Sequence, residues 1–167
     1  MTDCASSDIA TCCAQLATLL LTQKRMLATA ESCTGGLIAA ACTDLAGSSA
    51  WFERGFVTYS NEAKASMLGV DAALISSHGA VSEPVARSMA QGALQHSLAQ
   101  VSVAVTGVAG PSGASPDKPV GTVWFAWALP WGITSELQHF DGDRATVRAA
   151  TVQHALARLV TLLKAPS

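Results

Sequence analysis

Hydroxyl, amine and guanidinium groups that could act on a carbonyl substrate occur in four short segments of this chain. In the first, residues 30–36 (AESCTGG), the hydroxyl of Ser32 could attack a carbonyl carbon. The resulting oxyanion could be held by the backbone amides that follow, those of Thr34, Gly35 and Gly36. A turn from a strand into a helix suits this role, because a helix N-terminus favours negative charge. The structural alternative is a helix N-cap whose glycines allow close packing.

The thiol of Cys33, directly after Ser32, competes for the role of nucleophile. A helix N-terminus lowers the pKa of a thiol and would activate it. The alternative is a small buried side chain, since residues along such a turn tend to point inward. Loss of activity only on replacing Cys33 would assign the role to the thiol.

A second segment, residues 59–64 (YSNEAK), could supply the base that a serine nucleophile needs. No histidine stands in an obvious catalytic motif, so Lys64 is the natural candidate; in a partly apolar cleft it can lose its proton near neutral pH. Tyr59 could relay a proton or bind substrate, and Asn61 is a further candidate for substrate contact. The structural alternative is a surface helix capped by Asn61, with a solvated lysine.

Residues 106–111 (TGVAGP) follow the best predicted strand. In α/β sheets ligands bind beyond the carboxyl ends of the strands, so Thr106 and Gly107 are candidates for substrate or oxyanion contact. The loop over residues 107–119 contains three glycines and three prolines and could cover the substrate. A purely structural turn is the alternative.

The fourth segment, residues 142–144 (GDR), opens the last predicted helix. Asp143 is expected to cap that helix. The positive charge of Arg144 in the first turn is slightly unfavourable with respect to the helix dipole. A residue kept there at that cost could bind a phosphate or carboxylate.

The composition predicts a cytoplasmic protein rather than a membrane, secreted or nucleic-acid-binding one. Of 167 residues, 50% are apolar and 13% charged, and the net charge is −2. The longest apolar run, around residues 16–21, is too short for a membrane span, and no basic leader indicates a signal peptide. Five cysteines without CxxC spacing argue against a disulfide scaffold and a zinc site.

Hydrophobic periodicity, caps and β-branched runs predict a single three-layer α/β/α domain over residues 8–167, after a loose tail at 1–7. The late hairpin makes the sheet mixed, although mostly parallel. Helices are expected at about 8–23, 37–45, 61–69, 72–76, 82–97 and 143–163, and strands at 26–30, 52–59, 101–106, 121–129 and 133–140.

Seven motifs in a fixed order make the chain resemble the CinA C-terminal domain family, in the stand-alone form of the PncC-type nicotinamide-nucleotide amidases. The match covers about residues 8–163. The motifs are residues 30–36, 47–52 (GSSAWF), 55–64 (GFVTYSNEAK), 78–83 (HGAVSE), 106–111, 118–123 (KPVGTV) and 142–144.

The resemblance implies an α/β/α homodimer that hydrolyses nicotinamide mononucleotide to nicotinate mononucleotide and ammonia, in pyridine-nucleotide salvage. It implies no metal and no cofactor, and neither nucleic acid nor membrane as a partner. Our hypothesis is acyl transfer in which Ser32 attacks, Lys64 accepts the proton and Tyr59 relays or orients. This hypothesis requires the side chains at positions 32 and 64 to meet at one cleft.

Two other classes of function stay open at this point. A non-catalytic nucleotide-binding or regulatory module would need the glycine turns but not Lys64, so tight binding without turnover would favour it. An esterase or other serine hydrolase is the third class, and the absence of a G-x-S-x-G motif counts against it.

Overall fold

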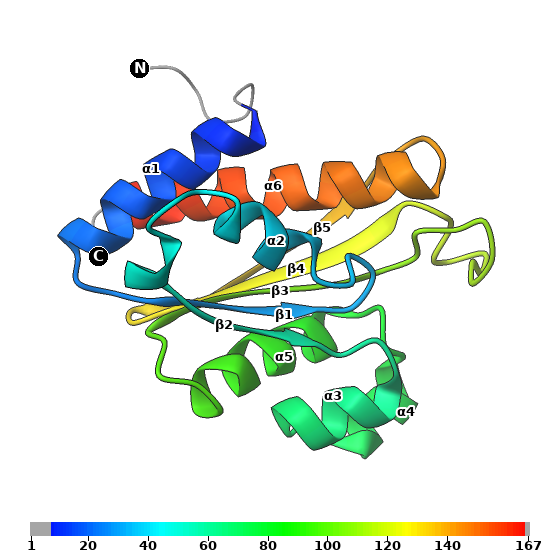
Figure 1. Cartoon of the computed structure of the whole chain (residues 1–167). Helices are drawn as coiled ribbons and strands as arrows, with labels where there is room; N and C mark the ends of the chain where they lie inside the picture. Colours follow the sequence, from blue (N-terminus) through cyan, green and yellow to red (C-terminus); the bar gives the residue numbers. More distant parts are fainter. Residues whose placement is uncertain (1–7, 166–167) are drawn as a thin grey trace.

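The computed structural model of the protein describes residues 8–165, which form a five-stranded sheet with helices on both faces (Figure 1). The predicted tail at 1–7 lies outside the described residues. The elements are α1 (Ile9–Thr22), β1 (Leu27–Glu31), α2 (Leu37–Thr43), the 3₁₀ helix η2 (Ser48–Ala50), β2 (Phe52–Val57), α3 (Asn61–Leu68), α4 (Ala72–His78), α5 (Glu83–Gln95), β3 (Val101–Gly107), β4 (Thr122–Leu129), β5 (Gly132–His139) and α6 (Arg144–Lys164).

The strand order of the sheet is β2-β1-β3-β4-β5. β1 pairs in parallel with β2 and with β3, whereas β4 is antiparallel to both of its neighbours. Every strand except β4 therefore runs in one direction, which confirms the predicted mixed, mostly parallel sheet. The carboxyl ends of β1, β2 and β3 consequently lie at the same edge.

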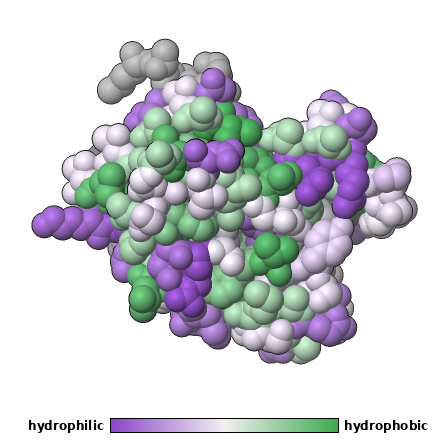
Figure 2. Space-filling view, viewed as in Figure 1, coloured by the Kyte–Doolittle hydropathy of each residue, from purple (hydrophilic) through white to green (hydrophobic). Residues whose placement is uncertain are grey.

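The helices form two layers: α1, α2 and α6 cover one face of the sheet, and α3, α4 and α5 lie on the other (Figure 1). Each layer encloses its own cluster of buried apolar side chains. Hydrophobic and hydrophilic residues are interspersed over the face shown in Figure 2. Within residues 8–165, no helix combines the length and the apolar character that crossing a membrane requires.

Most predicted boundaries agree with the structure to within a few residues, but one predicted cap is wrong. Ser60, not Asn61, is the N-cap of α3, because its hydroxyl accepts the Ala63 amide proton at 3.0 Å. Asn61 is therefore the first helical residue, and its side chain is free to face the pocket described below. Asp8 and Asp143 cap α1 and α6 as predicted.

Candidate active site

A pocket of about 320 Å³ lies where the loops after β1, β2 and β3 meet the start of α6. It follows the rule that α/β sheets bind ligands beyond the carboxyl ends of their strands. Most of the predicted site residues line it, namely Ser32, Tyr59, Asn61, Lys64, Thr106, Gly107 and Arg144. Thr34, Gly35 and Gly36 are not among its lining residues.

Ser32 and Lys64 meet in this pocket, although 32 positions separate them in the chain. Ser32 follows β1 directly, and Lys64 lies in the first turn of α3, which follows β2. The Lys64 Nζ lies 3.0 Å from the Ser32 Oγ. The two parallel strands thus bring a hydroxyl and an amine within hydrogen-bond distance at one cleft.

The environment of Lys64 favours its neutral form. Its side chain is 1% exposed and forms no ion pair with a described carboxylate. Burial lowers the pKa of Lys64, because the ammonium loses its water. The carbonyls of Thr58 and Tyr59 lie 3.0 and 3.4 Å from Nζ and can accept both protons of a neutral amine. The remaining lone pair is then available to the Ser32 hydroxyl.

Cys33 also lines the pocket, but its thiol is held in the protonated form. Burial is the main cause that raises the pKa of Cys33 to about 11, and the charge of Glu31 acts in the same direction. A thiol with that pKa is almost entirely protonated near neutral pH, and the thiol is a weak nucleophile compared with the thiolate. The chemistry of the two neighbouring groups therefore favours Ser32.

The three residues after Cys33 shape the turn rather than line the pocket. The Thr34 hydroxyl donates to Glu31 at 2.6 Å, and the Gly35 amide donates to the Ser32 carbonyl at 3.1 Å. Gly35 and Gly36 have φ angles of 56° and 102°, a left-handed region that favours glycine. Because the Gly35 amide is engaged within the turn, it is a poor candidate for the predicted oxyanion contact in this conformation.

Tyr59 and Arg144 are joined at the mouth of the pocket. The Arg144 guanidinium donates to the Tyr59 hydroxyl at 2.9 Å and to the Gly110 carbonyl at 2.9 Å. Lys64 contacts Tyr59 only through the backbone carbonyl. The Tyr59 hydroxyl therefore lies with the arginine instead of between Ser32 and Lys64, which suits an orienting role better than a proton relay.

Thr106 and Gly107 close the pocket from the end of β3. The Thr106 hydroxyl donates to the Ala80 carbonyl at 2.8 Å, which ties β3 to the segment before α5. A Cβ at Gly107 would lie 2.8 Å from the Thr122 carbonyl oxygen, so a larger residue would push β4 away. Ser112 and Gly113 from the loop after β3 also line the pocket, in line with the predicted covering role of that loop.

Glu31 is a functional candidate to which sequence reasoning assigned no role. Its carboxylate is fully buried and accepts bonds from the hydroxyl of Thr29 (3.2 Å) and the amides of Ile38 (2.9 Å) and Ala39 (3.0 Å), besides that of Thr34. These donors fix the start of α2 relative to β1. An acidic residue that ends an otherwise apolar strand is the sequence signal that could have indicated it.

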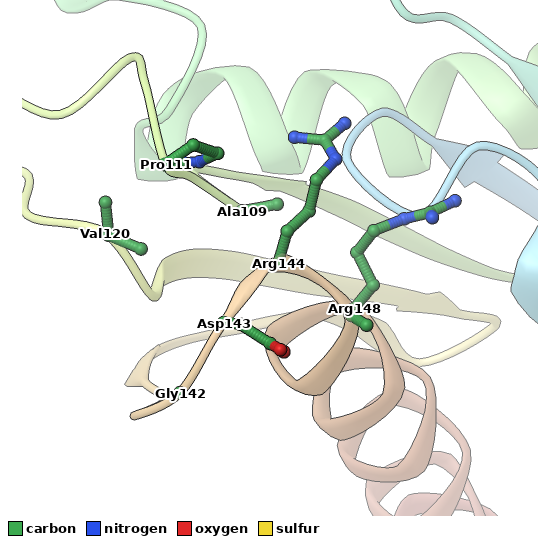
Figure 3. Close-up of a pocket in the computed structure, with 8 residues that line it drawn as sticks. Ala109, Pro111, Val120, Gly142, Asp143, Arg144 and Arg148 are labelled. Carbon is green, nitrogen blue, oxygen red and sulfur yellow. The ribbon is translucent and has the colours of Figure 1, made fainter.

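A second, more open pocket of about 630 Å³ adjoins the first and shares Ala109 and Arg144 with it. Figure 3 shows Arg144 and Arg148 pointing from the start of α6 in the same direction, with Pro111 and Val120 on the facing loop. Within residues 8–165, no three His, Cys, Asp or Glu side chains are grouped so that they could hold a metal ion.

The fold and this site define an α/β domain with a buried serine–lysine pair at the carboxyl ends of parallel strands. The chain belongs to the CinA C-terminal domain family, whose model matches residues 9–163. The match covers the helices and strands that build both pockets.

Curated relatives and solved structures agree with this assignment. Nicotinamide-nucleotide amidohydrolase PncC of Escherichia coli strain K12 is 58% identical over 133 residues, 78% of this chain and 80% of that protein. A CinA-like protein of Akkermansia muciniphila is 53% identical over 142 residues, but this chain spans only 34% of its length. The crystal structure of competence/damage inducible protein CihA from Agrobacterium tumefaciens, 47% identical, superposes with a TM-score of 0.90 over 93% of this chain and 96% of that one.

Proposed function

We propose that this chain hydrolyses the carboxamide of nicotinamide mononucleotide to nicotinate mononucleotide and ammonia. The observation that carries the proposal is the 3.0 Å approach of the Lys64 amine to the Ser32 hydroxyl in a polar pocket. The choice of substrate is based on the activity named for the Escherichia coli relative, which is 58% identical.

The reaction we propose is acyl transfer through Ser32. Its oxygen attacks the carboxamide carbon while its proton passes to the neutral amine of Lys64. When the tetrahedral intermediate collapses, Lys64 returns that proton to the departing nitrogen and ammonia leaves. Water then attacks the ester while Lys64 accepts a proton from it, and Lys64 returns that proton to the Ser32 oxygen as nicotinate mononucleotide departs. No step requires a metal.

The other pocket residues are proposed to bind and orient the nucleotide. Arg144 at the mouth can pair with the phosphate, because a guanidinium binds phosphate oxygens in a fixed fork geometry. Tyr59, held by Arg144, and Asn61 can orient the ring or the ribose. For the oxyanion we retain the amides of Thr34 and Gly36 as proposed donors, whereas the Thr106 hydroxyl already donates to the Ala80 carbonyl.

We propose that the protein acts as a cytoplasmic homodimer built from a single domain over residues 8–167. Among the described cysteines, Cys13, Cys33 and Cys42 are free and buried, as suits a reducing compartment. Light scattering on the purified chain tests the dimer, and a monomeric mass at working concentration would contradict it.

Ammonia release from nicotinamide mononucleotide tests the reaction, with and without a chelator. We expect wild-type activity to be unaffected by the chelator. Folded Ser32→Ala and Lys64→Ala should each lose roughly a thousandfold or more in kcat. A folded Ser32→Ala variant with near-wild-type turnover would remove Ser32 as nucleophile. Tight binding without turnover in the wild type would favour the non-catalytic binding module instead.

A further inference from the structure

The guanidinium of Arg148, in the second turn of α6, binds the turn that carries Ser32. Its Nε donates to the Cys33 carbonyl at 3.1 Å, and its Nη2 donates to the Thr34 carbonyl at 3.2 Å. Charge-assisted bonds of this kind are stronger than those between neutral groups. One side chain thus joins the last helix of the chain to the residues directly after the nucleophile.

These two bonds also fix the direction of the amides on the other side of each peptide. A peptide unit is planar and trans, so holding its carbonyl holds its N–H in the opposite direction. The Cys33 carbonyl shares a peptide with the Thr34 amide, and the Thr34 carbonyl shares one with the Gly35 amide. The Gly35 amide in turn donates to the Ser32 carbonyl at 3.1 Å, so the orientation set by Arg148 reaches the backbone of the nucleophile.

The turn is held from two sides by opposite charges. Glu31 accepts the Thr34 hydroxyl and the first amides of α2, while Arg148 donates to the turn's carbonyls. The hydrogen bonds of the Glu31 carboxylate go to β1, the turn and α2, so among the described side chains only Arg148 joins this turn to α6 by hydrogen bonds. Without Arg148, the Thr34 carbonyl would keep its bond from the Leu37 amide and the Gly35 amide its bond to Ser32, whereas the Cys33 carbonyl would lose the bond that limits rotation of the Cys33–Thr34 peptide.

We propose that Arg148 is a positioning residue for the acyl-transfer step, a role that rests on the function proposed above. It acts through the Cys33–Thr34 and Thr34–Gly35 peptides and keeps Ser32 and the neighbouring amides in the arrangement that the transition state requires. Misplacement of reacting groups by about 1 Å can cost a hundredfold in rate. The effect of losing Arg148 therefore falls on kcat rather than on KM.

The competing interpretation is that Arg148 binds the phosphate of the substrate directly. It lines the 630 Å³ pocket together with Arg144, and Figure 3 shows the two side chains next to each other. Against this, its Nε and Nη2 are already engaged with carbonyls. If Arg148 bound the phosphate, replacing it would raise KM for a phosphate-bearing substrate and leave KM for the dephosphorylated counterpart unchanged. The two roles can therefore be separated.

The test uses Arg148→Gln and Arg148→Lys in the full chain, with Arg158→Gln as a matched control on the same helix. Arg158 pairs with Glu136, away from the pocket. We measure kcat and KM for nicotinamide mononucleotide and nicotinamide riboside. We also measure the rate of Ser32 labelling by an alkyl fluorophosphonate, in which the Ser32 oxygen bonds to phosphorus, fluoride leaves and the proton passes to Lys64.

For Arg148→Gln we expect kcat and the labelling rate to fall together, roughly 10- to 100-fold, with KM changed less than about threefold. Arg148→Lys, which can donate to one carbonyl at a time, should lie between Gln and the wild type, and it is the decisive variant if Arg148→Gln does not fold. The proposal is overturned if kcat and labelling match the wild type, or if only the KM of the mononucleotide rises. It is also overturned if Arg158→Gln lowers kcat equally.

Labelling separates this proposal from the proposed function. A wild-type chain that is labelled at Ser32 but releases no ammonia from the mononucleotide would overturn the substrate assignment, while the labelling rates of the Arg148 variants would still test the positioning role. A wild-type chain that is neither labelled nor active would overturn both.

Discussion

The two faces of the sheet are packed with side chains of different size, although the same strands supply both. Towards α1, α2 and α6 the strands present Val103, Phe125 and Trp127, whereas towards α5 they present Ala104 and Ala126. Alternation along a strand produces this division, because successive side chains point to opposite faces. The cluster on the bulky face has more members, and the small-residue face lets a helix approach the sheet closely.

The helices on the small-residue face also set the position of Lys64, the proposed base. α3, which carries Lys64, packs on α5 at Gly92, where any Cβ would collide with the Leu68 carbonyl. The backbone-to-backbone approach therefore fixes how far Lys64 stands from Ser32. We infer that the bulky face chiefly stabilises the fold, and that the close packing of α3 on α5 chiefly sets the distance between Lys64 and Ser32.

The largest expected effect on stability is that of Trp127→Ala on the bulky face. Trp127 is fully buried, stacks on Phe125 with centroids 5.6 Å apart and donates to the Ala155 carbonyl. Its removal should lower the free energy of unfolding by about 3–5 kcal/mol in urea titration. The kcat of the folded fraction should stay within about twofold. Trp131→Ala, at an exposed site, is the control, and a parallel loss of kcat in Trp127→Ala would break the division between the faces.

Gly92→Ala on the other face should cost less stability and more activity. The added methyl group must push α3 from α5, at about 1–3 kcal/mol for overpacking. Because Lys64 moves with α3, we expect kcat/KM to fall at least tenfold, on the order expected for a small misplacement of a catalytic group. Gln91→Ala, at an exposed position of the same helix, controls for changes in helix propensity. Unchanged activity in a destabilised Gly92→Ala protein would contradict the geometric role.

Lys64→Met should gain stability at neutral pH while losing activity. The pKa of Lys64 is lowered in the folded state, so the unfolded state binds more protons and wild-type stability rises as pH increases towards the unfolded pKa of about 10.4. The advantage of Lys64→Met should therefore shrink over that interval, as measured by urea unfolding at several pH values. In the wild type, kcat/KM should rise with pH through the lowered pKa. A stability difference between the wild type and Lys64→Met that does not change with pH would contradict a lowered pKa of Lys64 in the folded state.

The smallest effect is expected for Cys33→Ala, which should keep ammonia release within about threefold of the wild type. Burial keeps the thiol protonated, with a pKa of about 11, so it contributes no thiolate at neutral pH. Loss of activity in Cys33→Ala with retention in Ser32→Ala would transfer the nucleophile's role to the thiol.

Sequence reasoning predicted the fold well because its signals are local. Apolar alternation over residues 101–106 and the Asp caps at positions 8 and 143 depend on neighbours in the chain, and the structure agrees with them. The meeting of Ser32 and Lys64 was also predictable, since parallel strands bring the residues that follow them to one edge. The wrong cap at Asn61 arose because Ser60 and Asn61 are both good caps and only the geometry decides between them.

The contacts that hold the site could not be predicted in the same way. Arg148 binds backbone carbonyls 114 and 115 positions away, and a carbonyl leaves no signature in the sequence. Only its spacing of four residues from Arg144, which puts both on one helix face, could have suggested a shared direction. Residue type alone allows the Tyr59 hydroxyl either to relay a proton or to orient the substrate, and only the structure, in which this hydroxyl accepts from Arg144, favours the orienting role.

Hydroxyl and carbonyl oxygens surround the Lys64 amine, and no described carboxylate pairs with it. Dissolved ions screen charges in solvent, but they have little effect on a hydrogen bond in a buried place. The chemical step should therefore be nearly indifferent to ionic strength, and salt should act chiefly where Arg144 meets the charged end of an incoming nucleotide.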